Sequence, residues 1–567
     1  MDSEVKNNSQ RSKSFLREAV ILTVASFAVK IIGVVFKIPL TNILGENIGI
    51  FTAAYSIYAM LFMLSTSGLP VAVSKLVAAS NEKGRGREAK RIAFLAMIVF
   101  GVIGFLFAVG LVVFAPQIAK LTKHTDSALA MQIIAPALFF ICVCASVRGY
   151  FQGLRNMFPT AISQFIEAFF KLTVGLGAVL YADHIGASVA VKAACAISGV
   201  SAGTLFATVY ILIYRRFSKK CVPAQSDEGV ESDSKLLKLI VLVALPVTLT
   251  AAALYFSQFL DTIIIVNCLE ASGVNVKTAE TLFSAYTGLS VPIYDLLPAT
   301  LVFPIATSIL PAVSGALAVK KTKRASYLTA QAIRISGIIA VPCGVFLFVT
   351  GRSCISLLYG ADNWSKPIPI GNGNSIIPLE SASLSLSILA FAVFFISVVS
   401  TCNSLLNAYG KPHLPFIAVV IGISVLTVSE IALLYSPLGI QGAPIGSLIC
   451  YFIVTLLDIW FLRKYCGVRL KLAGMFARPV LCGLISGAFV FAVYRLVYSL
   501  WQSPDSRTAS FFTLLAAGIT LVIAYVITTL VFRAIKEDEV RLLPKGNFIA
   551  DKLISLGWLK RVEIEEE

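Results

Sequence analysis

The stretch that decides how this chain is interpreted is KIIGVVFKIPL, residues 30–40, within a longer apolar region that runs from Phe15 to Ala79. It ends the first of two apolar segments in that region, which we predict at 18–40 and 48–79. A lysine near the middle of a bilayer costs about 2.5 kcal/mol or more, so such residues usually face protein or a watery cavity. Lys30 and Lys37 are seven residues apart and share one helix face. We interpret this hairpin as one wall of an anion-binding cavity.

The second segment ends in STSGLPVAVSK, residues 65–75, which adds a third lysine, Lys75, and a break. Glycine and proline interrupt or bend helices, so they mark places where a membrane helix can hinge. We predict hinges at Gly33, Pro39, Gly68, Pro70, Pro292, Pro298 and Pro311.

Composition alone places the chain among membrane proteins. Its 567 residues are 57% hydrophobic and 14% charged, with a mean hydropathy of +0.85. About 20 apolar residues suffice to cross the hydrocarbon core as a helix. We predict fourteen spans at 18–40, 48–79, 92–115, 128–150, 157–181, 187–214, 236–267, 281–310, 328–350, 381–406, 414–436, 441–462, 476–498 and 508–532.

The net charge of +17 is interpreted as a topology signal and not as a nucleic-acid footprint. Lysines and arginines of the N-terminal tail, the even-numbered loops and the C-terminal tail far outnumber those of the odd-numbered loops. The positive-inside rule therefore predicts that both termini are cytoplasmic. Basic clusters at 83–87 and 320–324 fit this interpretation, with contact to anionic lipid as the alternative.

No motif for catalysis is found in the sequence. The eleven cysteines are scattered through apolar segments without ligand spacing, and the three histidines lie in loops or at helix ends. There is no HExxH, paired CxxC, phosphate loop or GxSxG motif. We predict a protein that is not an enzyme and has no cofactor or metal site.

An internal repeat organises the chain. APALFFICV, residues 135–143, matches AFAVFFISV, residues 390–398, at six of nine positions with an offset of 255. Six spans separate the copies, so the halves should cross the membrane in the same sense, and such transporters place their site between the repeats. We predict an N-lobe at 18–214 and a C-lobe at 236–462, with the remaining parts at 1–17 and 215–235 (cytoplasmic), 476–532 (two extra helices) and 533–567 (cytoplasmic tail).

Intramembrane charges differ between the halves. The first half carries the candidate substrate-binding residues Lys30, Lys37, Lys75 and Lys171, whereas carboxylates dominate the second. Candidates for coupling-ion binding or gating are Asp295, Asp261, Glu167 and Glu430. Several of these residues have a structural alternative, but snorkelling does not explain Lys30, which lies about twelve residues from each end of its predicted helix.

These alternatives are specific. Glu167 and Lys171 are four residues apart and could form a helical ion pair. Lys75 could snorkel to the membrane surface. Asp295, which lies between Pro292 and Pro298, could make a structural hydrogen bond to another helix.

The segments KIIG, KIPL and ILG of 30–45, the run at 67–78, and ATSILPAVS at 306–314 resemble the polysaccharide transporter and stage V sporulation protein B group. That group belongs to the multidrug/oligosaccharidyl-lipid/polysaccharide (MOP) exporter superfamily, as does the lipid II flippase. The resemblance implies an all-α, V-shaped, MATE-like bundle of two six-helix lobes, with two C-terminal helices that form a groove for a lipid tail.

The resemblance also implies a function. It predicts flipping of an undecaprenyl-pyrophosphate-linked sugar from the inner to the outer leaflet of a bacterial plasma membrane, in peptidoglycan synthesis or sporulation. Na⁺, H⁺ or the membrane potential would drive this transport. Partners would be this substrate and membrane lipids, with the protein a monomer. Lys30 and Lys37 stand where flippase relatives usually carry arginine, so the bidentate phosphate contact is absent.

Two other functions are considered. A cation-coupled drug antiporter of the same superfamily would use carboxylates and needs only twelve helices, and a non-transporting scaffold would not need buried charges on its first helix. After the last span, 547–561 is expected to form either an interfacial amphipathic helix or a soluble helix docked to the bundle.

Overall fold

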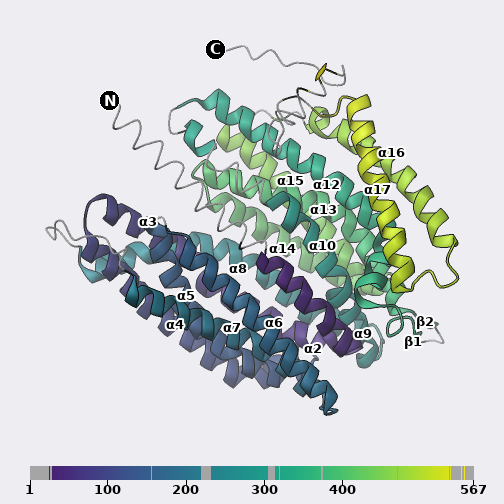
Figure 1. The fold of residues 1–567 in the computed structure, drawn as a ribbon, viewed down its shortest axis with the longest axis horizontal. Helices are drawn as coiled ribbons and strands as arrows, with labels where there is room; N and C mark the ends of the chain where they lie inside the picture. Colours follow the sequence, from purple (N-terminus) through teal and green to yellow (C-terminus); the bar gives the residue numbers. More distant parts are fainter. Residues whose placement is uncertain are drawn as a thin grey trace. The chain divides into compact units, whose positions relative to one another are not determined.

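The structure is a computed structural model that describes residues 28–154, 156–218, 231–303, 313–317, 320–371, 374–468 and 472–535, with isolated positions at 25, 470, 537, 551, 554 and 555. The N-terminal tail, Pro311 and most of 547–561 lie outside the described residues. Figure 1 shows the helices that make up almost all of the described chain. Residues 28–44 are helical.

The further elements follow in chain order. They are η1 (Gly45–Asn47), α2 (Ile48–Thr66), α3 (Leu69–Glu82), α4 (Gly86–Leu121), η2 (Thr125–Ser127), α5 (Ala128–Gly153), α6 (Phe158–His184), α7 (Val189–Phe217), α8 (Asp233–Ala271), α9 (Val276–Ala285), η3 (Tyr286–Ser290), α10 (Val291–Leu297), η4 (Pro298–Val302), α12 (Thr322–Tyr359), β1 (Ile368–Gly371), β2 (Asn374–Ile376), α13 (Pro378–Ala408), α14 (His413–Leu434), η5 (Gly439–Gln441), α15 (Gly442–Cys466), α16 (Leu472–Ser499) and α17 (Arg507–Val531). Strands β1 and β2 pair as a short antiparallel hairpin.

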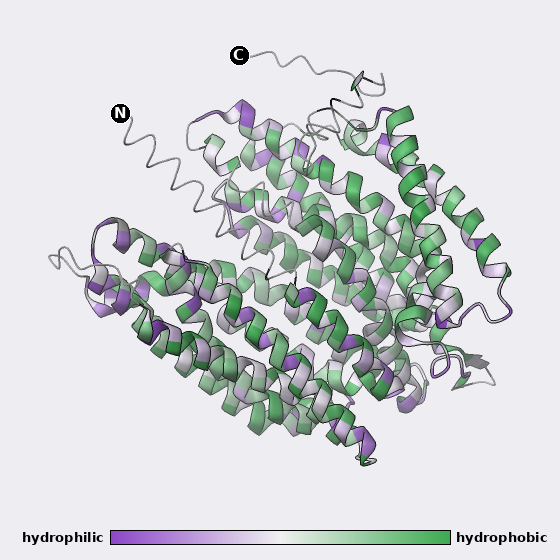
Figure 2. Ribbon diagram, in the orientation of Figure 1, coloured by the Kyte–Doolittle hydropathy of each residue, from purple (hydrophilic) through white to green (hydrophobic). Residues whose placement is uncertain are grey.

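Within the described residues, twelve helical stretches are long and apolar enough to cross a membrane. The first, Ala28–Asn81, covers residues 28–40 of the segment predicted at 18–40 and all of the segment predicted at 48–79, and the segment predicted at 281–310 is not among the twelve. Figure 2 shows hydrophobic residues along most of the length of the helices. The protein is therefore a multi-pass, all-α membrane protein, as predicted.

Several helices continue beyond the predicted segments. α4 covers Gly86–Leu121 where 92–115 was predicted, and α12 covers Thr322–Tyr359 where 328–350 was predicted. Arg352 therefore lies in a helix and not in the loop between the segments predicted at 328–350 and 381–406. Hydropathy finds only the apolar part of a helix, whereas backbone hydrogen bonding continues into turns that carry charges.

The second predicted segment is broken at the expected Gly/Pro site. α2 ends at Thr66 and α3 begins at Leu69, with Pro70 in its first turn. The N–H group of Gly68 donates a hydrogen bond to Oγ1 of Thr248 on α8, at 3.2 Å. A Cβ atom at Gly68 would overlap the backbone carbonyl of Ala244 on the same helix. The break thus lets α8 pack closely, and its use as a hinge stays a prediction.

The predicted segment at 281–310 is irregular where it is described. Two π-helical turns, η3 and η4, flank α10. Pro292 lies in the first turn of α10 and Pro298 in the first turn of η4. Because proline removes a backbone donor, it favours such departures from α-helical pairing, and π-helical turns are frequent at functional sites.

The chain divides into two compact units, Met1–Ser284 and Ala285–Glu567. In the first unit α8 packs on α2 and α3. The predicted domains follow sequence repeats and assign this helix to the second lobe, so contacts and repeats divide the chain at different places. The lobe boundary at 215–235 stays a prediction.

Each unit contains the same packing pattern. α4 packs on α5, α6 on α7 and α5 on α7 in the first unit, and α12 on α13, α14 on α15 and α13 on α15 in the second. Oγ1 of Thr208 donates to the carbonyl of Phe140 at 2.8 Å. Oγ1 of Thr455 donates to the carbonyl of Phe395 at 3.3 Å. Phe140 and Phe395 are equivalent in the predicted repeat, which this parallel supports.

Ion pairs attach the start of α8 to α4. Arg91 donates to both carboxylate oxygens of Asp233, with 2.7 Å between Nη2 and Oδ2. This hydrogen bond lowers the pKa of the Asp233 carboxyl below its usual value. Buried Glu88 accepts from the hydroxyl of Ser80 at 2.7 Å and from the N–H group of Glu231 at 3.3 Å.

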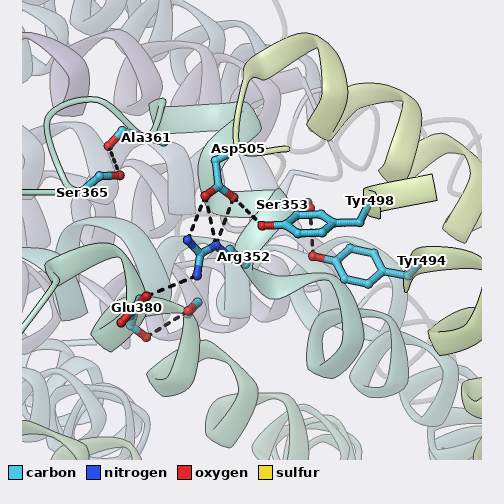
Figure 3. Close-up of polar contacts among 9 residues, drawn as sticks. Arg352, Ser353, Ala361, Ser365, Glu380, Tyr494, Tyr498 and Asp505 are labelled. Carbon is cyan, nitrogen blue, oxygen red and sulfur yellow. Dashed lines mark hydrogen bonds and ion pairs between the residues drawn. The ribbon is translucent and has the colours of Figure 1, made fainter. Parts of the chain in front are cut away.

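A polar cluster in the second unit attaches the loop between α16 and α17 to α12 (Figure 3). Arg352 donates to Asp505 at 2.8 Å (Nη2 to Oδ2) and 3.0 Å (Nε to Oδ1). The hydroxyl of Tyr498 donates to the same carboxylate at 3.1 Å. Arg352 also lies 3.6 Å from Glu380 at the start of α13. One arginine therefore connects three helices with the loop.

Replacing Asp505 with asparagine should lower the thermal stability of the protein. The charge-assisted bonds to Arg352 are weakened, which should cost about 1 kcal/mol because the pair is partly exposed. Thermal unfolding in detergent measures the effect. The control is Asp362→Asn, because Asp362 is exposed and has no hydrogen-bond partner among the described residues. Equal unfolding temperatures for the two variants would contradict the expectation.

Gly68→Ala should destabilise the first unit. The new methyl group overlaps α8, and overpacking of this kind costs roughly 1–3 kcal/mol. Gly110→Ala on α4 is the matched control, because its Cβ would meet nothing within 4 Å and alanine favours the helix. A variant at Gly68 as stable as that at Gly110 would show that the close approach is absent.

Candidate functional site

Two of the predicted lysines contact one group of aromatic rings. Nζ of Lys37, on the helix at 28–44, lies 5.8 Å from the ring centre of Phe51. Nζ of Lys171, on α6, lies 5.3 Å from the ring centre of Phe36 and 5.0 Å from that of Tyr55. These distances are within the range of cation–π attraction. The structure thus gathers both ammonium groups around the start of α2.

The rings on α2 form a continuous row. Phe51, Tyr55, Tyr58 and Phe62 follow each other with ring centres 5.8 Å apart at each step. Their spacing of four, three and four residues places them on one helix face. This stripe is visible in the sequence, but the sequence analysis did not single it out.

A cavity of about 100 Å³ lies beside this row. Its lining residues include Lys171, Glu167 and three tyrosines, Tyr55, Tyr58 and Tyr255. These residues come from α2, α6 and α8 of the first unit. The volume suits a phosphate-sized group, because sites for drug-sized ligands usually exceed 300 Å³.

Glu167 pairs with an arginine that the sequence analysis missed. Nη2 of Arg148, on α5, donates to Oε2 of Glu167 at 2.9 Å, and its Nε donates to the hydroxyl of Ser163 at 2.8 Å. Arg148 is only 9% exposed. It lies near the end of the segment predicted at 128–150, where a basic residue is easily taken for a snorkelling one. Glu167 therefore has a structural partner on α5 in addition to its position at the cavity.

Two glycines of α7 allow this helix to pack closely against α6 at Glu167 and Lys171. A Cβ atom at Gly199 would lie 2.5 Å from the carbonyl oxygen of Lys171, and one at Gly203 would overlap the carbonyl of Glu167. Small residues four apart allow membrane helices to pack this closely. The backbone that carries Glu167 and Lys171 thus rests directly on α7.

The remaining predicted residues of the first helices are placed differently. Lys30 is half-buried two turns before Lys37. Lys75 is exposed on α3, and the described lining of the cavity does not include it. The helix at 28–44 continues through Gly33 and Pro39 and ends before Gly45, whose φ is +52°. Roles for Lys30 and Lys75 in binding, and for Gly33 and Pro39 as hinges, stay predictions.

The predicted carboxylates lie on separate helices. Asp261 is half-buried on α8 of the first unit, and Asp295 is half-buried on α10 of the second. Glu430 on α14 is 1% exposed, and Asp458 on α15 is fully buried. Among the described residues, no three Asp, Glu, His or Cys side chains gather where they could hold a metal ion. Ion coupling or gating by Asp261, Asp295 and Glu430 stays a prediction.

Glu167→Gln should destabilise the protein more than Lys171→Gln does. It leaves the charge of buried Arg148 without its carboxylate, and breaking a buried pair costs up to about 3–5 kcal/mol. Glu167 is 27% exposed, so we expect the lower part of that range. Thermal unfolding of both variants, and of a double variant with Arg148→Gln, checks this. Equal losses for the two single variants would show that Arg148 does not depend on Glu167.

Comparison with known proteins gives the context of this site. The family model described as polysaccharide biosynthesis protein matches residues 15–316, more than half of the chain. The chain is 27% identical over 548 residues to stage V sporulation protein B of Bacillus subtilis (strain 168), covering 94% of this chain and 98% of that protein.

Two solved structures share the fold. A lipid II flippase MurJ in an inward closed conformation has a TM-score of 0.65 and 14% identity, covering 90% of this chain and 98% of that one. A MATE family transporter of the MOP superfamily, in an inward-facing conformation, has a TM-score of 0.64 and 12% identity, covering 79% of this chain and 98% of that one. The predicted resemblance is confirmed. The chain belongs to the polysaccharide biosynthesis protein family.

Proposed function

We propose that this protein is a flippase that moves an undecaprenyl-pyrophosphate-linked oligosaccharide from the inner to the outer leaflet by alternating access. The observation that carries the proposal is that the ammonium groups of Lys37 and Lys171 lie against neighbouring aromatic rings, and that Lys171 also lines a phosphate-sized cavity. Similarity to stage V sporulation protein B and to the lipid II flippase MurJ supports a lipid-linked saccharide as the substrate class.

The chemistry of the substrate requires such a site. A pyrophosphate cannot cross hydrocarbon unpaired, because burying an uncompensated charge costs far more than a protein can supply. Ammonium groups offset the charge, and the phenols of Tyr55, Tyr58 and Tyr255 can donate hydrogen bonds to phosphate or sugar oxygens. Lysine binds phosphate as a point charge without a fixed fork, which suits a head group that must be released on the other side.

The charges around the cavity favour an anion. Lys171 and Arg148 contribute two positive charges and Glu167 one negative charge, and Lys37 lies on the neighbouring ring of Phe51. The Arg148–Glu167 pair is internally neutral. The lysines therefore decide the sign of the site.

The alternative is a MATE-type cation-coupled drug antiporter, which would use a carboxylate to bind a cation. The fold does not distinguish the two functions, because MurJ and MATE structures both resemble this chain. The carboxylate at this cavity, Glu167, already accepts a hydrogen bond from Arg148. The site therefore supports the flippase better than the antiporter.

Lys37→Gln and Lys171→Gln should each slow flipping at least about tenfold, the equivalent of one lost charged contact of roughly 1.4 kcal/mol. The assay uses liposomes that contain the purified protein and a panel of fluorescent undecaprenyl-pyrophosphate sugars, with or without an imposed Na⁺, H⁺ or potential gradient. The control is Lys120→Gln, an exposed lysine at the end of α4.

Two outcomes would reject the proposal. One is unchanged flipping by both variants when they are folded and inserted as the wild type is. The other is wild-type protein that moves a cationic dye under an ion gradient but none of the lipid-linked sugars, which would favour the antiporter. The gradient series also shows which ion drives transport.

A further inference from the structure

A second cationic cavity lies in the first unit, where α4 begins and α5 and α7 end. Its volume is about 370 Å³, and its lining includes Lys90, Tyr150, Phe151, Arg215, Arg216 and Ser218. No Asp or Glu is among its described lining residues. It contains none of the residues of the Lys37–Lys171 site and is formed largely by different helices.

The cavity is lined by two buried aromatic residues and by exposed basic residues. Tyr150 is 3% exposed and Phe151 is 1% exposed. The guanidinium of Arg215 lies 5.6 Å from the ring centre of Tyr150. Lys90 and Arg216 are exposed, and neither forms an ion pair with a carboxylate of the described chain. Their charges are available to an anion from outside the protein.

An apolar groove continues from this cavity along α4 and α5. Two hollows of about 420 Å³ and 440 Å³ share Phe105 and Phe139 as lining residues. Together they follow α4 from Met97 to Val113, about 24 Å at the helical rise of 1.5 Å per residue. Sδ of Met97 lies 4.0 Å from Nη1 of Arg215, so the groove begins beside the cationic cavity.

We propose that the cavity and groove bind an anionic membrane phospholipid, with its phosphate at Lys90, Arg215 and Arg216 and an acyl chain along α4 and α5. The groove is longer than the hydrocarbon region of one leaflet, which is roughly 15 Å thick. Basic pockets between membrane helices on the cytoplasmic side suit anionic head groups, and the positive-inside pattern predicts that this end faces the cytoplasm. A free phosphate would have no use for the groove, so the combination selects a lipid.

The test measures lipid binding to the purified full-length protein in neutral detergent by native mass spectrometry. Probes are phosphatidylglycerol, phosphatidylcholine and inorganic phosphate. Wild type should prefer phosphatidylglycerol to phosphatidylcholine. Lys90→Gln and Arg216→Gln should each weaken phosphatidylglycerol binding roughly fivefold, and together about 25-fold. The matched control is Lys323→Gln with Arg324→Gln, two exposed basic residues at the start of α12.

A groove variant distinguishes lipid from free phosphate. Val109 lines the groove and is 45% exposed. The variant Val109→Trp should weaken phosphatidylglycerol binding without changing the binding of inorganic phosphate. Equal binding of phosphatidylglycerol by the Lys90/Arg216 and Lys323/Arg324 double variants would overturn the proposal. Phosphate binding that depends on Lys90 and Arg216, with lipid binding unaffected by Val109→Trp, would also overturn it and leave a phosphate pocket.

Discussion

The structure of the first unit depends on keeping lysine ammonium groups inside an apolar bundle. An isolated ammonium group in hydrocarbon is costly, so the surroundings must replace part of the hydration that it loses. Here the negative faces of Phe36, Phe51 and Tyr55 do so for Lys37 and Lys171. Aromatic faces attract a cation without neutralising its charge.

Several neighbouring features support this arrangement. Arg148 and Ser163 hold Glu167, so the carboxylate next to Lys171 has a partner of its own. Close packing of α6 on the glycines of α7 fixes the backbone of both residues. Buried charges that are held by hydrogen bonds and rigid helices are costly to rearrange, so the first unit presents a preformed cationic surface. The second unit repeats the helix packing, and its buried charged residues include Glu430 and Asp458.

The sequence predicted much of the fold because the fold follows from local patterns. The length of the apolar segments predicted the helices, and the APALFFICV and AFAVFFISV motifs predicted a repeat. The matching contacts of α5 with α7 and of α13 with α15 support that repeat. Helix ends were less accurate, as Arg352 shows, because helical hydrogen bonding does not stop where apolar residues stop.

The site was predicted only in part. Lys37 and Lys171 were singled out as candidates because a charged residue within an apolar run can be recognised from the sequence alone. Arg148 was missed because its importance comes from Glu167, which lies 19 residues away in the chain and on another helix. The cationic cavity at Lys90 and Arg216 was seen in the sequence only as basic residues of loops, because its shape depends on three helices that meet at one end.

The most direct measurement is a solid-state NMR distance between ¹⁵N in the lysine side chains and ³¹P in bound undecaprenyl pyrophosphate. If Lys37 and Lys171 bind the head group, the spectra show strong dipolar coupling that disappears in the Lys37→Gln/Lys171→Gln variant. Coupling that persists in that variant, or no coupling while the lipid is bound, would contradict the assignment of the site.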